Sequence, residues 1–179
     1  EFESEGVRID ELLRLADLVN KSDLKLGIKI GGCEAVKDAL DVKQFGADYI
    51  IAPMIESRYA LSKFSDLIER VYSSSLNRPL ALFNIETHLS YVNFDSILSY
   101  ALSSSFIDGV VFGRVDFTLS KGLSRSDVNS SQIESPCFDV SSKLRATKLD
   151  YVVGGGISSS SLPFLRRLNS VYLSRFETR

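Results

Sequence analysis

Residues 80–87 have the sequence LALFNIET. The run is short and largely apolar up to Ile85, and polar residues follow it before a segment of helical period at residues 94–102. Parallel strands that are covered by helices have this character. The stretch therefore predicts a strand at residues 80–85 whose polar carboxyl end leads into a helix.

The same alternation of strand and helix continues on both sides of this stretch. Further strands are predicted at residues 26–30, 49–54, 109–115 and 151–156, and further helices at residues 33–45 and 59–71. The strand centres recur on average at close to the roughly 31 residues that one unit of an eight-unit barrel occupies. The pattern predicts a parallel α/β fold.

Each end of the chain adds one further predicted strand. Residues 2–3 precede a helix predicted at residues 10–21, and residues 171–176 follow the last predicted helix. We therefore expect an α/β (βα)8 TIM-type barrel that lacks one βα unit, with residues 1–179 as a single barrel domain, incomplete at one or both ends. A doubly wound sheet fits less well, because the three glycines at 154–156 lack the spacing of the phosphate-binding fingerprint.

Composition argues against several classes of partner. The chain has 21 Lys and Arg against 23 Asp and Glu, a net charge of −2, and no block of like charges, so neither nucleic acid nor an anionic membrane is an expected partner. Cys33 and Cys137 are distant, without nearby ligands at metal spacing, which argues against a disulfide or a zinc site. Its first residues show no secretory signal pattern, and we expect a cytoplasmic protein.

Charged and polar residues gather at the predicted carboxyl ends of the strands, where parallel α/β folds carry their function. These ends carry Glu3, Glu5, Lys29, Glu56, Glu86, Thr87, His88, Arg114 and Asp116. Glu86 and Asp116 end consecutive predicted strands and should stand side by side. Two carboxylates with open positions for water and substrate suit Mg²⁺ or Mn²⁺.

Four segments resemble one known family. Residues 84–87 (NIET) and 109–122 (GVVFGRVDFTLSKG) resemble the metal-binding pair of the HpcH/HpaI aldolase and citrate lyase β-subunit superfamily. Residues 46–57 (GADYIIAPMIES) and 1–6 (EFESEG) are similar to two further motifs of that superfamily, in the same order along the chain. The resemblance spans about residues 1–122.

The resemblance implies a metal-dependent carbon–carbon lyase or aldolase. The resemblance implies that Glu86 and Asp116 hold Mg²⁺ or Mn²⁺. The substrate would be a 2-oxoacid such as pyruvate, or an acyl-CoA-like compound, which binds the metal and whose enolate the metal stabilises. Backbone amides around Val115 and Asp116 would hold the substrate carboxylate. The remaining residues expected to bind substrate are Glu56, Thr87, His88 and Gly113. We also expect a homo-oligomer.

The chain departs from the family pattern at the expected catalytic cation. The family usually has Arg where this chain has Lys29, and Lys keeps the positive charge but loses the bidentate fork. Because Lys29 stands between Ile28 and Ile30 in an apolar strand, its charge must point either into the barrel mouth or towards a helix. Arg114 is the alternative catalytic cation. His88, the single His of the chain, could transfer a proton.

Two other functions remain open from the sequence. One is a catalytically silent or reassigned barrel that serves as a binding or assembly subunit. The other is a divergent phosphoenolpyruvate-using enzyme, since enolate chemistry at a metal also serves that substrate.

Overall fold

The computed structural model describes residues 6–73, 75 and 77–178. In this part of the chain one sheet contains six strands in the order β1 to β6, and every neighbouring pair is parallel. The strands are β1 (Gly27–Lys29), β2 (Tyr49–Ala52), β3 (Leu80–Ile85), β4 (Gly109–Gly113), β5 (Asp150–Gly154) and β6 (Arg175–Phe176). The prediction of parallel α/β architecture is confirmed.

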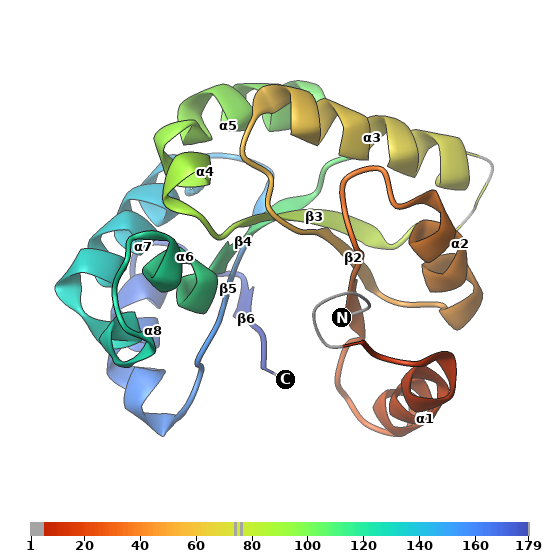
Figure 1. Cartoon of the computed structure of the whole chain (residues 1–179), viewed down its shortest axis with the longest axis horizontal. Coiled ribbons are helices and arrows are strands. Elements are labelled where there is room, and N and C mark those ends of the chain that lie inside the picture. The colour runs from red at the N-terminus through yellow and green to blue at the C-terminus, as the bar shows by residue number, and fades with distance from the viewer. Residues whose placement is uncertain (1–5, 74, 76, 179) are drawn as a thin grey trace.

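Helices connect these strands in sequence. They are α1 (Ile9–Asn20), α2 (Val36–Phe45), α3 (Arg58–Tyr72), α4 (His88–Val92), α5 (Phe94–Ser103), α6 (Arg114–Ser120), α7 (Ser131–Leu144) and α8 (Leu162–Asn169), with short 3₁₀ helices η1 (Arg125–Asn129) and η2 (Ser159–Ser161). The sheet is strongly curled, and α2, α3, α5, α7 and α8 lie along its outer side (Figure 1). Among the described residues the strands form a curled half-barrel.

The expectation of an eight-unit barrel is therefore met only in part. Six strands, and not a closed ring of eight, are present in the described residues. The strand predicted at residues 2–3 lies outside them, and that predicted at residues 171–176 is reduced to Arg175–Phe176. The strand predicted at residues 109–115 ends at Gly113, because α6 begins at Arg114.

Alternate residues of each strand face opposite sides of the sheet. On the outer side, residues such as Ile50, Phe83 and Phe112 join the main hydrophobic core with the helices. On the concave side, a second cluster consists of Ile51, Leu82, Val111 and Val152, with Tyr49 packed against it. The concave side is therefore apolar at mid-sheet, and any polar site on it must lie nearer to the strand ends.

The curl brings β6 back towards β2. The guanidinium of Arg175 lies 4.4 Å from the centroid of the Tyr49 ring, and it also pairs with Asp150. Tyr49 and Asp150 are the first residues of β2 and β5. These contacts occupy the concave side at the amino-terminal ends of the strands. A polar site on the concave side is therefore expected at the carboxyl ends.

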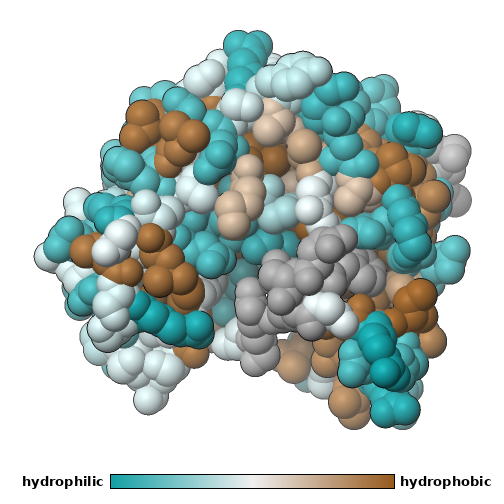
Figure 2. All heavy atoms as spheres, viewed as in Figure 1, coloured by the Kyte–Doolittle hydropathy of each residue, from teal (hydrophilic) through white to brown (hydrophobic). Residues whose placement is uncertain are grey.

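Helix α1 exposes several apolar side chains to solvent. Hydrophobic atoms reach the surface over α1 (Figure 2), where Ile9, Leu13 and Leu18 are 52%, 53% and 65% exposed.

Within the described residues, no helix combines the length and the apolar character that crossing a membrane requires.

Candidate active site at the carboxyl ends of the strands

Glu86 is the best anchored carboxylate of the candidate site. It follows directly after β3 and is 1% exposed. Its Oε2 accepts hydrogen bonds from Lys29 Nζ at 2.9 Å and from Asn84 Nδ2 at 2.7 Å, and its Oε1 accepts one from the Met54 backbone N at 2.9 Å. Hydrogen bonds to an ionised group are shorter and stronger than neutral ones. Three donors therefore fix both oxygens of a buried carboxylate.

Lys29 lies on the concave side of the sheet. Its neighbours Ile28 and Ile30 belong to the outer core, while its own side chain is 13% exposed and forms the ion pair with Glu86. Of the two directions open from the sequence, the structure shows the one that faces Glu86. The two charged groups of a buried ion pair must stay in contact, because their attraction offsets the cost of removing both from water.

Met54 supplies its donor from a strained backbone. It is the one non-glycine residue with positive φ, 51°, in the described part of the chain. Such conformations cost of order 1–3 kcal/mol and persist where the surrounding structure requires them. Here the left-handed turn after β2 is accompanied by a hydrogen bond from the Met54 N–H to Glu86.

Glycine in β4 makes room for Glu86. A Cβ at Gly113 would lie 2.8 Å from Glu86 Cβ and 3.0 Å from its Oε2. Gly154 is the register partner of Gly113 on β5, and it lies beneath the side chain of Glu177 in the same way. Two glycines thus support two acidic side chains on the concave side. Gly113, which we expected to bind substrate, lies against the side chain of Glu86.

Asp116 is displaced from its expected position. It lies in the first turn of α6, not at a strand end, and its side chain is half-buried. Ser120 follows one helical turn later on the same face of α6, and its hydroxyl accepts a hydrogen bond from the His88 backbone N at 2.8 Å. The face that carries Asp116 is therefore turned towards the connection between β3 and α4.

Glu56 and Thr87 contact each other. The Thr87 hydroxyl donates to Glu56 Oε1 at 2.7 Å and accepts from Ser90 N, so that Thr87 is the N-cap of α4. The Asn93 side chain donates to the Glu56 carbonyl oxygen at 2.8 Å. These bonds join the connections that follow β2 and β3. His88 begins α4 and is exposed.

Arg114 is directed away from Glu86. Its guanidinium is held by Asn129 Oδ1 at 2.9 Å and by the Gly155 carbonyl oxygen at 2.8 Å, with longer bonds to Gly154 O and Ser161 Oγ. It also lies 5.1 Å from the centroid of the Phe164 ring. Burial lowers the pKa of this guanidinium from its usual value. Arg114 therefore joins α6 to η1 and to the loop after β5.

Replacement of Arg114 by Met is expected to lower the free energy of unfolding by about 3 kcal/mol, because buried acceptors lose their charged donor. Arg125→Met is the matched control, since Arg125 is exposed on η1 and should change stability by less than about 0.5 kcal/mol. Urea unfolding measures both. Equal effects for the two variants would contradict the structural role of Arg114.

The amides of Arg114 and Val115 lie against the loop after β5. Gly155 has φ +78°, and a Cβ there would lie 2.6 Å from Val115 N and 2.9 Å from Arg114 N. Because both neighbours are backbone atoms, they have little freedom to move. Among the described residues, no side chain caps the amino end of α6.

Gly155→Ala is therefore expected to destabilise the fold by at least about 2 kcal/mol, from strain and overlap together. Gly32→Ala serves as the control, because a Cβ at Gly32 meets no atom within 4 Å. Chemical denaturation should separate the two variants clearly. A Gly155→Ala protein as stable as the control would show that the loop can shift away from α6.

The carboxylate oxygens of Glu86 and Asp116 are of the kind that hard divalent cations prefer. In the described part of the chain, no group of three or more His, Cys, Asp or Glu residues is arranged to hold a metal ion. Mg²⁺ is commonly bound by one or two carboxylates, with water and substrate completing its octahedral coordination.

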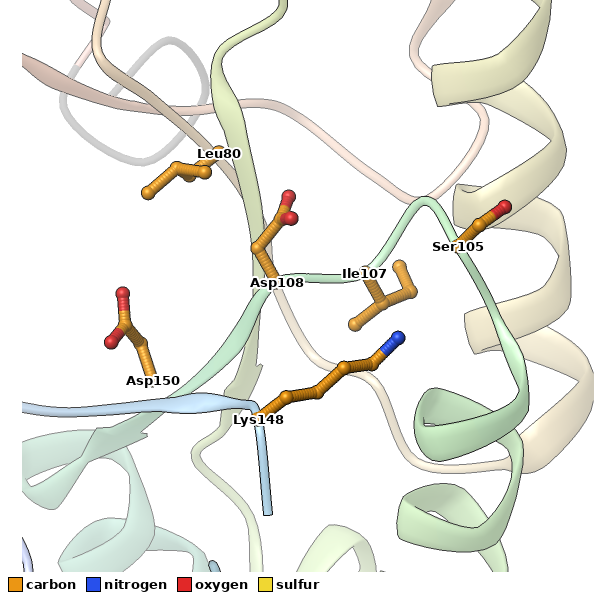
Figure 3. Close-up of a pocket in the computed structure, with 6 residues that line it drawn as sticks. All are labelled: Leu80, Ser105, Ile107, Asp108, Lys148 and Asp150. Atoms are coloured by element: carbon orange, nitrogen blue, oxygen red, sulfur yellow. The ribbon is translucent and has the colours of Figure 1, made fainter.

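Two shallow cavities lie elsewhere. One, of about 190 Å³, is at the amino-terminal ends of β3 to β5 and is lined by Leu80, Ser105, Ile107, Asp108, Lys148 and Asp150 (Figure 3). Asp108 is already engaged there by Arg78 and by the Ala81 N–H. A second cavity of similar volume lies against α2 and α3. Neither contains residues of the Glu86 site, which we favour on chemical grounds.

Fold and site together define a parallel α/β half-barrel with acidic groups at the carboxyl ends of its strands. Residues 5–152 match the HpcH/HpaI aldolase/citrate lyase family, and the chain belongs to this family. No curated protein sequence matches the chain.

Solved structures share the fold at low sequence identity. An HpcH/HpaI aldolase from Desulfitobacterium hafniense DCB-2 has a TM-score of 0.73 at 11% identity, over 96% of this chain and 72% of the aldolase. An HpcH/HpaI aldolase/citrate lyase family protein from Burkholderia cenocepacia J2315 has a TM-score of 0.71 at 12% identity, over 93% and 72% of the two chains. The citrate synthase SbnG has a TM-score of 0.70 at 14% identity, over 96% and 73%.

Three residues of the site were not predicted from the sequence. Asn84 and Met54 bind Glu86, and Glu177 lies over Gly154. A signal existed for two of them: Asn84 is a polar residue inside an apolar strand, and Glu177 directly follows a predicted strand, as Glu86 does. Met54 contacts Glu86 through its backbone N–H, and the pattern of side chains in the sequence does not indicate such a contact.

Proposed function

We propose that this chain is a metal-dependent carbon–carbon lyase that acts through the enolate of a pyruvate-like 2-oxoacid. The observation that carries the proposal is the buried Glu86 carboxylate at the end of β3, with the Lys29 ammonium 2.9 Å from it on the concave side. Membership of an aldolase and citrate lyase family supports this class of reaction.

Glu86 and Asp116 are the proposed ligands of Mg²⁺ or Mn²⁺. When bound there, the metal supplies Lewis-acid stabilisation for negative charge that develops on the substrate oxygens. A cation at this place would be close to Lys29, so both carboxylates are needed to offset most of the positive charge.

Lys29 is the proposed cation that faces the developing oxyanion. Its hydrogen bond to Glu86 holds the ammonium in place before substrate binds, so little reorganisation is needed during the reaction. The uncapped amides around Val115 and Asp116 are proposed to hold the substrate carboxylate. Glu56, Thr87 and the exposed imidazole of His88 surround the same end of the sheet and are proposed to contact the remainder of the substrate.

A second function has one observation in its favour. Glu86 is almost fully buried, and all three of its donors come from the chain itself. An ion pair of this kind is also what a catalytically silent barrel would retain, if the chain served as a binding or assembly subunit.

Binding of oxalate, a planar mimic of the pyruvate enolate, separates the two functions. Titration calorimetry should detect oxalate binding when Mn²⁺ is present and at least about tenfold weaker binding without it, because the metal supplies the chelating charge. Asp116→Asn should remove the metal dependence. Oxalate binding that is absent, or equal with and without Mn²⁺, would favour the silent barrel.

A further inference from the structure

Two acidic residues and two glycines form one row across the carboxyl ends of β3 to β6. Glu86 follows the last residue of β3 and is next in register to Gly113 of β4, whose register partner on β5 is Gly154. Glu177 follows the last residue of β6, and its N–H donates to the Val153 carbonyl oxygen at 3.1 Å, which continues the ladder between β5 and β6. The order across the sheet is therefore Glu86, Gly113, Gly154 and Glu177.

Both acidic side chains extend over the glycines. A Cβ at Gly113 would lie 3.0 Å from Glu86 Oε2, and a Cβ at Gly154 would overlap Glu177 Oε1 and lie 2.7 Å from its Cγ. The two carboxylates thus approach the same part of the concave side, one from β3 and the other from β6. Because neighbouring strands lie about 4.8 Å apart, a molecule the size of pyruvate can reach across both glycine positions.

The glycines replace the apolar filling of the sheet by bare backbone. Two residues earlier on the same strands, Val111 and Val152 fill the concave side with their side chains. Glycine weakens a strand, and it often marks a place where a ligand or another backbone approaches closely. Two glycines in register at the carboxyl ends of β4 and β5 therefore indicate the place of the substrate between the acidic groups.

Glu86 and Glu177 differ in their surroundings. Glu86 is 1% exposed, and three donors among the described residues, including Lys29, bind its two oxygens. Glu177 is half-buried and follows β6, the last strand of the described sheet. A group that takes a proton from a substrate must also exchange this proton with water. The half-buried Glu177 carboxylate meets this requirement, whereas Glu86 is held in place by its donors.

We propose that Glu177 is the catalytic base that removes a proton from C3 of the substrate. This inference rests on the function proposed above and names the group that forms the enolate. The Glu177 carboxylate takes the proton, the electron pair of the C–H bond becomes the C2=C3 double bond, and the carbonyl π electrons move to the oxygen that faces Lys29. The protonated carboxyl then exchanges its proton with water. General base catalysis typically contributes about 10²–10⁴-fold to a rate.

Two reactions that form the same enolate test the role of Glu177. Exchange of the C3 protons of pyruvate with D₂O requires a base. Decarboxylation of oxaloacetate breaks the C3–C4 bond and gives the same enolate without removal of a C3 proton. NMR follows both reactions with Mg²⁺, and the rates without protein are subtracted. We expect Glu177→Gln to lower kcat/KM for exchange by at least about 10²-fold and to keep at least about a third of the decarboxylation rate.

Glu177→Asp and Glu69→Gln are the matched controls. Aspartate keeps the carboxylate on a shorter side chain and should restore part of the exchange. Glu69 is exposed on α3, so the same loss of charge there should change neither rate by more than about twofold. Circular dichroism establishes that each variant is folded at the assay temperature.

The outcomes separate this inference from the function on which it rests. Exchange at the native rate in Glu177→Gln would overturn the role of Glu177 as the base. An equal loss of exchange and decarboxylation in that variant would also overturn it, because a base is needed for only one of the two reactions. Absence of both reactions in the native protein would overturn the proposed function, and this inference with it.

Discussion

Glu86→Gln is expected to lower kcat/KM for metal-dependent proton exchange of pyruvate by about 10³-fold, the loss seen when a charge-stabilising group is removed from an active site. The amide carries no charge for the metal. Its NH₂ group would also face the donors Lys29, Asn84 and Met54, which now bind the two carboxylate oxygens.

Glu69→Gln provides the matched control for this variant. Glu69 is exposed on α3 and lies outside the site, so the same change of charge there should leave exchange within about twofold of the native rate. Circular dichroism should confirm that both variants are folded at the assay temperature. A folded Glu86→Gln protein that exchanges pyruvate as fast as the control would remove Glu86 from the mechanism.

Lys29→Met is expected to lower the exchange rate by about 10²-fold or more, because the oxyanion loses its cation. It should also destabilise the fold by about 3–5 kcal/mol, since Glu86 is left as a buried charge without its ammonium partner. Lys29→Arg, which keeps the charge, should retain part of the activity and most of the stability.

Lys37→Met is the control for the loss of a lysine. Lys37 forms an exposed ion pair with Asp41 on α2, and such pairs contribute little to stability. Exchange rates and urea unfolding, measured on all three lysine variants, separate the two roles of Lys29. If Lys29→Met loses stability but exchanges pyruvate at the native rate below its unfolding transition, Lys29 is a structural ion-pair residue only.

The sequence predicts the strands of the sheet well because their signal is local. Apolar runs such as residues 80–85 are bounded by polar or glycine-containing turns, and Gly46 ends α2 in the left-handed conformation. Barrel closure depends instead on contacts between distant segments, such as Arg175 over Tyr49. The spacing of strands along the chain carries no information on these contacts.

The same distinction applies to the site. Because residues alternate across a strand, a charge at Lys29 had to face either Glu86 or the helices, and the structure alone shows which. The boundary after Gly113 was not predictable, since Val115 continues the β-branched character of the strand although residues 114–116 form the first turn of α6. Because residue 114 is helical and not part of β4, the Arg114 guanidinium points to Gly155 and Asn129.

Exchange of the methyl protons of pyruvate with D₂O, with and without Mg²⁺, tests the central claim most directly, because it reports enolate formation without the unknown electrophile. We expect the native protein to catalyse exchange only with the metal, and we expect Glu86→Gln to catalyse none. Exchange that is absent with Mg²⁺ and with Mn²⁺, or that proceeds equally in Glu86→Gln, would contradict it.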